Sequence, residues 1–227
     1  MTTALVNLSG GADSTICAVI AKQRFDSVYG ITFDYGQRHI IEIQSAIEVA
    51  EALNIQHEII DLGDNILKSM SPLVSASVLG TYQDKASLPT GVENTFVAGR
   101  NILFLTIAGN RASHLNIDDI FIGVCQEDFG GYYDCRQVFI DKMSDALNEG
   151  IYGQQRLTLH TPLMNMTKAE SIKLAHAILG DDFNKIFALT HTCYAGIHGG
   201  CGKCHACILR DAGFKEAGID DPLWRIR

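Results

Sequence analysis

The sequence contains no long apolar run and no run of basic residues. None of its hydrophobic stretches reaches the roughly 18 residues that a membrane-spanning helix needs, and the N-terminal MTTALVNLSG carries no basic leader. Its 18 Lys and Arg residues are outnumbered by 26 Asp and Glu, and a net charge of -8 is not typical of a nucleic-acid-binding protein. We therefore expect a cytoplasmic protein that acts on a small molecule, with neither a membrane nor a nucleic acid as its partner.

Proline is also scarce, and the sequence shows no internal repeat, linker or low-complexity tract. The 4 prolines, together with 47% hydrophobic and 19% charged residues, exclude fibrous and disordered classes of protein. A chain of 227 residues is long enough to bury a substantial core. We expect one domain over residues 1–227, which includes a metal-stapled C-terminal segment at residues 190–210.

Short apolar runs alternate with helical periodicity through the first half of the chain. The runs at residues 3–8, 27–33 and 57–62 are typical of strands, and residues 118–124 and 156–163 are candidates for a fourth and a fifth. Strands that alternate with helices predict an α/β fold with a doubly wound parallel sheet of about five strands, Rossmann-like in its topology. Such sheets bind ligands beyond the carboxyl ends of their strands.

Three later segments are also interpretable. Residues 101–112 are expected to form a buried helix, and residues 167–178 a second one whose Thr167 and Glu170 have the spacing of a capping box. Residues 63–95 are rich in Ser, Gly and Thr, without strong periodicity. A connection of that length is more often functional or mobile than a simple turn, so it is a candidate lid.

The stretch LSGGADS, residues 8–14, joins the first predicted strand to the first predicted helix. The start of a helix presents unpaired backbone N–H groups and partial positive charge, and glycines let the backbone approach a phosphate closely. Asp13 can meet a magnesium ion or cap the helix; the alternative is an ordinary glycine turn with Ser and Asp capping. No Walker-type GK[ST] follows. We expect an anion such as a phosphate to bind at Leu8, Ser9, Gly10, Gly11, Ala12, Asp13, Ser14 and Thr15.

This stretch matches SGGxDS and resembles the ATP-pyrophosphatase (PP-loop) family, whose fold is adenine nucleotide alpha hydrolase-like. The resemblance extends over nearly the whole chain to one subgroup, the 7-cyano-7-deazaguanine synthases. The stretches that carry it are FDYGQRH at 33–39, NTFVAGRN at 94–101, GVC at 123–125, DCR at 134–136, TPL at 161–163 and the cysteine cluster near the C-terminus.

The resemblance implies an ATP-dependent C–N ligase of queuosine biosynthesis. It implies that 7-carboxy-7-deazaguanine and free ammonia become 7-cyano-7-deazaguanine (preQ0) through adenylated acid and amide intermediates, with ATP and Mg²⁺ as co-substrate. Both carboxylate oxygens must leave, and hydroxide is a poor leaving group, so two ATP per nitrile is the simplest stoichiometry. A homodimer is implied by the resemblance alone.

Site residues are carried over where this sequence matches the family's motifs. Asp13, Arg100 and Lys168 are expected to be catalytic, since Arg100 and Lys168 open predicted helices where donors converge on anions. The substrate-binding candidates are Tyr35, Gln37, Arg38, Asp134 and Arg136. His39, taken alone, we interpret as a satisfied surface histidine rather than a base, and Cys135 as a pocket-lining residue.

Four of the 7 cysteines, Cys193, Cys201, Cys204 and Cys207, are expected to bind a metal. Four thiolates at this spacing favour one tetrahedral, structural Zn²⁺ per chain, because the closed set leaves no position for water. An iron–sulfur cluster, disulfides or free thiols stay open as alternatives, although the ferredoxin-type continuation C-x3-C-P is absent.

The sequence departs from the family at three positions. Ala98 and Tyr133 stand where the family usually has proline, and Val138 where it has an acidic residue. The last two leave open a relative that stops at the amide or joins a deazaguanine acid to another amine. A PP-loop enzyme that modifies tRNA would want a basic surface, which this acidic chain does not offer. A nucleotide-sensing module without turnover would keep the loop and the cysteine cluster but would not need Arg100 and Lys168.

Overall fold

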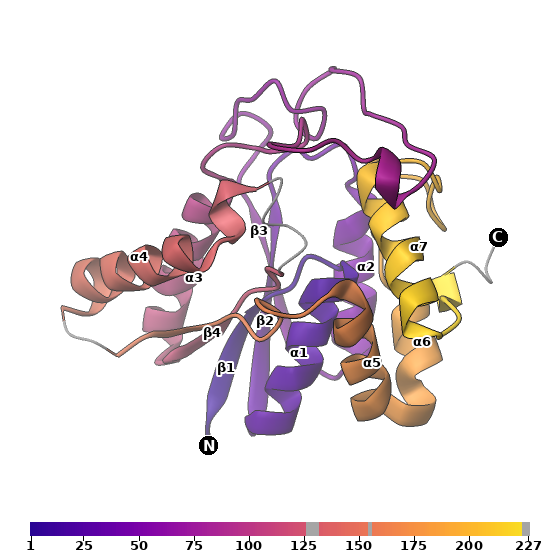
Figure 1. The fold of residues 1–227 in the computed structure, drawn as a ribbon. Helices are drawn as coiled ribbons and strands as arrows, with labels where there is room; N and C mark the ends of the chain where they lie inside the picture. Colours follow the sequence, from indigo (N-terminus) through magenta and orange to yellow (C-terminus); the bar gives the residue numbers. More distant parts are fainter. Residues whose placement is uncertain (126–131, 154–155, 224–227) are drawn as a thin grey trace.

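The computed structural model describes residues 1–125, 132–153 and 156–223. Its strands form one five-stranded sheet in the order β3-β2-β1-β4-β5, and every pairing is parallel (Figure 1). The strands are β1 (Thr3–Asn7), β2 (Ser27–Asp34), β3 (Gln56–Asp61), β4 (Asp119–Phe121) and β5 (Thr158–His160). The order reverses at β1, which places the topological switch point at its carboxyl end.

The central strand β1 is apolar on both faces because helices cover both sides of the sheet. Ala4 and Val6 pack into one hydrophobic core and Leu5 into the other, and all three side chains are fully buried. A strand buried on both faces has a continuous hydrophobic run instead of an alternating pattern. This explains why the run ALV forms a strand although its apolar residues do not alternate with polar ones.

Two layers of helices flank the sheet (Figure 1). One layer contributes to the core around Ala4 and Val6, and the other to the core around Leu5. The first layer comprises α1 (Ala12–Arg24), α2 (Ile41–Ala52), α5 (Lys168–Leu179), α6 (Phe183–Ala188) and α7 (His205–Ala217). The second comprises α3 (Arg100–Leu115) and α4 (Gln137–Leu147). The predicted doubly wound fold is confirmed, whereas one domain over residues 1–227 stays a prediction.

Local signals match the helices closely. Thr167 caps α5, with its side chain accepting from the Glu170 backbone N–H while the Glu170 carboxylate accepts from the Thr167 N–H, so the predicted capping box is confirmed.

The predicted fourth and fifth strands are shorter than expected, at three residues each. The chain leaves β4 to pass the start of α1, where a Cβ on Gly123 would come 2.9 Å from the Asp13 carbonyl carbon.

Residues 63–95 contain little regular structure apart from the short 3-10 helix η1 (Lys85–Ser87). The segment contacts the C-terminal part of the chain: the Tyr82 N–H donates to the Lys203 carbonyl at 2.7 Å, and Lys85 Nζ lies 3.3 Å from Glu216 Oε1. Whether this segment moves as a lid stays a prediction. Among the described residues, no helix has the length and apolar character needed to cross a membrane.

Candidate active site and metal centre

The loop after β1 is locked by its own side chains. Gly11 is the N-cap of α1, and its carbonyl accepts hydrogen bonds from the Ser14 hydroxyl at 3.0 Å and the Thr15 hydroxyl at 2.8 Å. Ser9 Oγ lies 3.1 Å from Ser14 Oγ. Gly11 has no side chain that could cap the helix, and the Asp13 carboxylate pairs with Lys168. The first N–H groups of α1 have no acceptor within the helix and suit an anion.

Gly10 fits this loop against α2. Its φ of +82° lies in the left-handed region, and an added Cβ would collide with the Glu42 carbonyl oxygen and approach the Ala46 nitrogen to 2.7 Å. Both conditions favour glycine. The loop is therefore pressed against the first turn of α2, which brings residues of that turn to the same site.

Two predicted catalytic side chains meet in front of the loop. Lys168 Nζ lies 2.5 Å from Asp13 Oδ2, and the two side chains retain 13% and 28% of their exposure. Asp13 is in the first turn of α1 and Lys168 is the first residue of α5. Their pairing places a cation and a carboxylate next to an anion-binding helix start, an arrangement suited to holding phosphates together with a metal ion.

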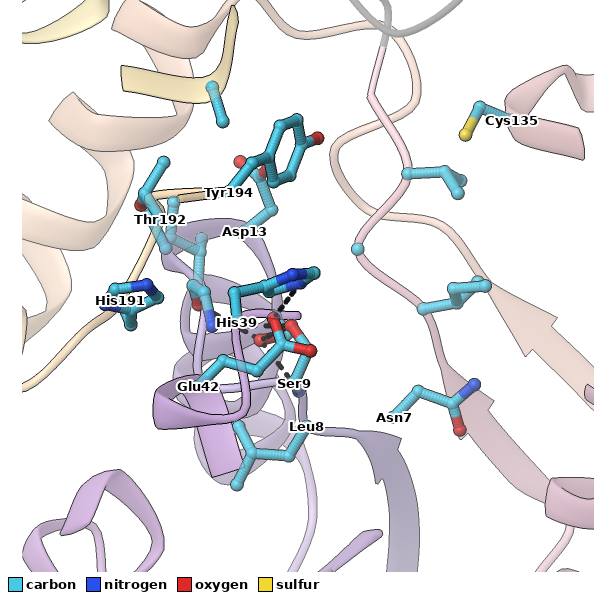
Figure 2. A pocket seen from close by; sticks show the side chains of 18 of the residues that line it. Asn7, Leu8, Ser9, Asp13, His39, Glu42, Cys135, His191, Thr192 and Tyr194 are labelled. Atoms are coloured by element: carbon cyan, nitrogen blue, oxygen red, sulfur yellow. Dashed lines mark hydrogen bonds and ion pairs between the residues drawn. The ribbon is translucent and has the colours of Figure 1, made fainter. Parts of the chain in front are cut away.

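A cavity of about 280 Å³ opens at this edge of the sheet (Figure 2). Its size is near the lower end of typical ligand pockets. Of the predicted site residues, those that line it are Leu8, Ser9, Gly11, Ala12, Asp13, Ser14, Tyr35, Arg100 and Lys168. Cys135, the predicted pocket-lining thiol, also lines it. Gly10 and Thr15 do not line the cavity among the described residues. Gly10 packs against α2, and Thr15 bonds to the Gly11 carbonyl.

Arg100 begins α3 after Gly99, whose φ of +80° is left-handed. The guanidinium lies among aromatic hydroxyls and hydrogen-bonds to Tyr35. Burial by itself lowers the pKa of Arg100, but Tyr35, Tyr132, Tyr194 and Asp134 together raise it. Burial raises the pKa of Tyr35 to about 12. The cavity therefore holds a permanent cation beside a tyrosine that stays protonated at neutral pH.

Two predicted substrate-binding residues hydrogen-bond to the surrounding fold, and whether they also bind substrate stays a prediction. Gln37 is buried, donates to the Phe33 carbonyl at 3.1 Å and accepts from the Tyr35 N–H at 2.9 Å. Asp134 is buried too, and the Asn101 N–H donates to its Oδ2 at 3.4 Å. Neither is among the described residues that line the cavity. Both orient neighbours that do, namely Tyr35 and Asn101.

Arg38 and Arg136 are exposed. Neither is among the described residues that line the cavity. Arg136 stacks over the ring of exposed Tyr133, with its Cζ 4.8 Å from the ring centroid. Whether these two arginines bind substrate stays a prediction. Residues 128–131, the first part of the DFGGYYDCR stretch, lie outside the described residues.

His39 corrects the interpretation made from sequence. It is buried, with 4% of its surface exposed, lines the cavity, and places Nε2 3.0 Å from Glu42 Oε2 (Figure 2). A polar stretch that follows a strand is typical of the protein surface, which is why the sequence misleads at this position. The i,i+3 spacing of His39 to Glu42 at the start of a helix was the available signal for this pair.

The C-terminal segment supplies further cavity residues that sequence reasoning did not select: His191, Thr192 and Tyr194. Arg210 holds this stretch in place, since its Nη1 donates to Thr190 Oγ1 at 2.8 Å and to Thr192 Oγ1 at 3.0 Å. Its side chain also forms a buried ion pair with Asp221 at 2.6 Å. These residues lie far along the chain from the SGGADS loop, and no local pattern marks them as part of the cavity.

The four predicted metal-binding cysteines converge. The Sγ atoms of Cys193, Cys201, Cys204 and Cys207 all lie within 4.8 Å of one another. Tetrahedral Zn–S bonds of about 2.3 Å require Sγ atoms about 3.8 Å apart, and the Cys201 and Cys207 Sγ atoms are 3.9 Å apart. The residues therefore fit a metal ion.

Comparisons with known proteins extend over the whole chain. Residues 3–218 match the family described as queuosine biosynthesis protein QueC. The 7-cyano-7-deazaguanine synthase of Gloeobacter violaceus is 58% identical over 229 residues, which cover 100% of this chain and 97% of the relative. That of Laribacter hongkongensis is 43% identical over 228 residues, covering 97% and 93% of the two chains.

Among solved structures, the chain is similar in fold to a predicted subunit of tRNA methyltransferase from Methanocaldococcus jannaschii. The TM-score is 0.50 at 20% identity, and the match covers 78% of this chain and 74% of the other. This likeness concerns the fold alone. The sequence similarity to the family is much higher. The family match covers residues 3–218, and two relatives are 43% and 58% identical to this chain. The chain belongs to the queuosine biosynthesis protein QueC family.

Proposed function

We propose that this protein is an ATP-dependent C–N ligase that converts 7-carboxy-7-deazaguanine and ammonia into 7-cyano-7-deazaguanine for queuosine biosynthesis. The observation that carries the proposal is the 58% identity, over the whole length, to a 7-cyano-7-deazaguanine synthase. The cavity supports it, because the SGGADS loop, Arg100 and Lys168 all face one space of about 280 Å³. The SGGADS loop and the two cations suit a polyphosphate, and the aromatic side chains of the cavity suit a flat ring.

In the first half of the reaction, a carboxylate oxygen of the substrate attacks the α-phosphate of ATP and pyrophosphate leaves. The chain contributes position and charge instead of a covalent bond. The start of α1 binds the departing pyrophosphate, and Lys168 offsets the negative charge that builds on it. Arg100 lines the same cavity beside Tyr35 and is the cation proposed to meet the carboxylate. Ammonia then displaces AMP and leaves an amide.

In the second half, the amide oxygen attacks a second ATP in the same place, and elimination of AMP yields the nitrile. Both halves need the same contacts with phosphate and leaving group, so one cavity serves for both. Mg²⁺, held by Asp13 and the phosphates, would supply further neutralisation of charge. Asp13, Arg100 and Lys168 are thus the catalytic residues of this proposal.

The cysteine cluster is proposed to hold one structural Zn²⁺ per chain. Its four Sγ atoms form a closed set next to the start of α7, which leaves no open position for a reacting water. Zinc would fix the segment that contributes His191, Thr192 and Tyr194 to the cavity. An iron–sulfur cluster is the alternative that metal analysis distinguishes.

We also propose three finer points. A homodimer and free ammonia as the nitrogen source rest on the family resemblance, and a cytoplasmic location rests on the cysteine cluster, which suits a reducing compartment. Binding of ATP and of a small-molecule substrate fits the family and the cavity. The formal charge of -8 supports a small molecule over tRNA as the substrate.

One observation bears on the alternative of an amide-forming relative. That alternative arose from Tyr133 and Val138, which depart from the family pattern. Both side chains are more than half exposed, at 54% and 58%, and neither is among the described residues that line the cavity. The departures therefore give little support to a different substrate, and the nitrile-forming reaction stays the better proposal.

The test is ATP–pyrophosphate exchange, which reports adenylation without ammonia. Purified protein should exchange labelled pyrophosphate into ATP when 7-carboxy-7-deazaguanine and Mg²⁺ are present. Bulk tRNA in place of the deazaguanine should support no exchange. Exchange with tRNA alone would overturn the proposal in favour of a tRNA-modifying enzyme.

A further inference from the structure

His39 and Glu42 form a buried pair against the phosphate-binding loop. His39 follows β2, Glu42 lies in the first turn of α2, and both line the cavity. The two side chains retain 5% and 16% of their exposure, and the Nε2 to Oε2 distance is 3.0 Å. Figure 2 shows the contact between the His39 ring and Glu42, and the ring centroids of His39 and Tyr194 are 5.7 Å apart. The proposed reaction leaves this pair without a role.

Glu42 is held in one position. Its Oε1 accepts from Gln37 Nε2 at 3.1 Å, and the same Gln37 amide is tied to the backbone at both ends, through Phe33 and Tyr35. Its Oε2 faces His39. A carboxylate fixed in this way retains the imidazole proton on Nε2 and leaves the lone pair on Nδ1. The same arrangement orients the base of a catalytic triad, with the two ring nitrogens exchanged.

His39 Nδ1 is buried and makes no hydrogen bond to any of the described residues. An acceptor without a partner in a buried position costs free energy, and such atoms are uncommon outside functional sites. The ionisable groups around the ring are Glu42, His191 and Tyr194.

The proposed function creates a need for a base at this place. When ammonia attacks the adenylated acid, a C–N bond forms, the C–O bond to phosphate breaks, and AMP leaves with the electron pair. The nitrogen must lose one proton for a neutral amide to result. Water that could carry this proton away would also hydrolyse the adenylate. A base on the wall of the cavity avoids that loss.

We infer that His39 is the general base of amide formation, with Nδ1 accepting the proton from the attacking ammonia and Glu42 as the residue that positions it. The inference rests on the proposed function and names the catalytic base of that reaction. The proton passes to the imidazole, the imidazolium is stabilised by the Glu42 carboxylate, and solvent takes the proton after AMP has left. Adenylation itself needs no such base.

The test separates the two steps in one protein. In His39→Gln, the amide nitrogen can still donate to Glu42, but the side chain has no basic atom. ATP–pyrophosphate exchange dependent on 7-carboxy-7-deazaguanine should stay within about twofold of the unchanged protein. Amide formation from ammonium should fall by ~10²–10⁴-fold, as for loss of a general base. His114→Gln, in the exposed last turn of α3, is the matched control and should alter neither rate.

Two further measurements keep the inference falsifiable. Hydroxylamine is a much weaker base than ammonia, so its adduct gives up the same proton more readily, and hydroxamate formation by His39→Gln should fall much less than amide formation. Glu42→Gln, a second variant, should slow amide formation by ~10-fold or more while exchange persists, because the tautomer is no longer fixed. If His39→Gln or Glu42→Gln loses exchange and amide formation together, the pair binds substrate and the inference is wrong.

Two outcomes separate the inference from the proposed function. Amide formation by His39→Gln at the unchanged rate would overturn the inference and leave the proposed function standing. Failure of the unchanged protein to catalyse any exchange with 7-carboxy-7-deazaguanine would overturn the proposed function, and this inference with it.

Discussion

Lys168 Nζ lies 2.5 Å from Asp13 Oδ2, although 155 residues separate the two in the chain. The fold brings them together because α5 and α1 pack side by side on one face of the sheet. Both residues lie at helix starts, so the pair stands next to backbone N–H groups that suit an anion. This relationship ties the first motif of the sequence to a helix far along the chain.

The first prediction concerns Lys168. Lys168→Met retains most of the side chain's volume and removes the charge, so we expect ATP–pyrophosphate exchange to fall by ~10²–10³-fold, as for loss of one electrostatic contact in a transition state. Lys173→Met, at an exposed position of the same helix, is the control and should leave exchange unchanged. Equal rates in the two variants would remove Lys168 from the mechanism.

The second prediction concerns Gly10. Gly10→Ala should destabilise the protein and abolish exchange, because the new Cβ collides with the backbone of α2. Gly63→Ala is the matched control: its φ of +71° is similar, but nothing lies within 4 Å of the added Cβ. We expect the free energy of unfolding to drop by about 1–3 kcal/mol more in Gly10→Ala than in the control, from the overpacking alone. Similar losses in urea titrations would contradict the close approach of loop and helix.

Metal removal gives the third prediction. Elemental analysis should find one zinc and no iron per chain, and Cys204→Ser should lower the zinc content together with the melting temperature. Because Cys204 is buried next to the start of α7, loss of the metal should also loosen the cavity wall at Tyr194. Equal melting temperatures with and without a strong chelator that has removed the metal would argue against a structural site.

The Arg210–Asp221 pair gives the fourth prediction. Both side chains are almost fully buried, at 3% and 2% exposure, so Asp221→Asn leaves a buried guanidinium without its counter-charge. We expect a loss of about 3–5 kcal/mol in the free energy of unfolding. Asp211→Asn, which breaks the exposed pair with Lys215, should cost less than about 1 kcal/mol. Comparable losses in denaturant titrations would show that burial does not decide the strength of these pairs.

Much of this architecture follows from local patterns. The apolar run ALV, the helical spacing that follows it and the Thr167–Glu170 capping box depend on neighbours in sequence, and the structure contains all of them. The convergence of the cysteines also follows from their spacing. Such features can be predicted from the sequence because the interactions that create them span only a few residues.

The roles inside the cavity depend on contacts that no local pattern encodes. Gln37 and Asp134 carry polar groups that suit a ligand, yet their hydrogen-bond partners are backbone and side-chain groups of the fold. His39 follows a strand in a polar stretch, yet it is buried, and Tyr194 of the C-terminal segment packs against its ring. Burial and choice of partner are set by elements that pack from elsewhere in the chain.

The central claim is that one cavity carries out two successive adenylations on one deazaguanine. The most direct measurement follows deazaguanine and nucleotide products together by mass spectrometry, with purified protein, 7-carboxy-7-deazaguanine, ATP, Mg²⁺ and ammonium. We predict a transient amide, then the nitrile, with two AMP and two pyrophosphate released per nitrile. An amide that accumulates without nitrile, or turnover that releases no AMP, would contradict the account.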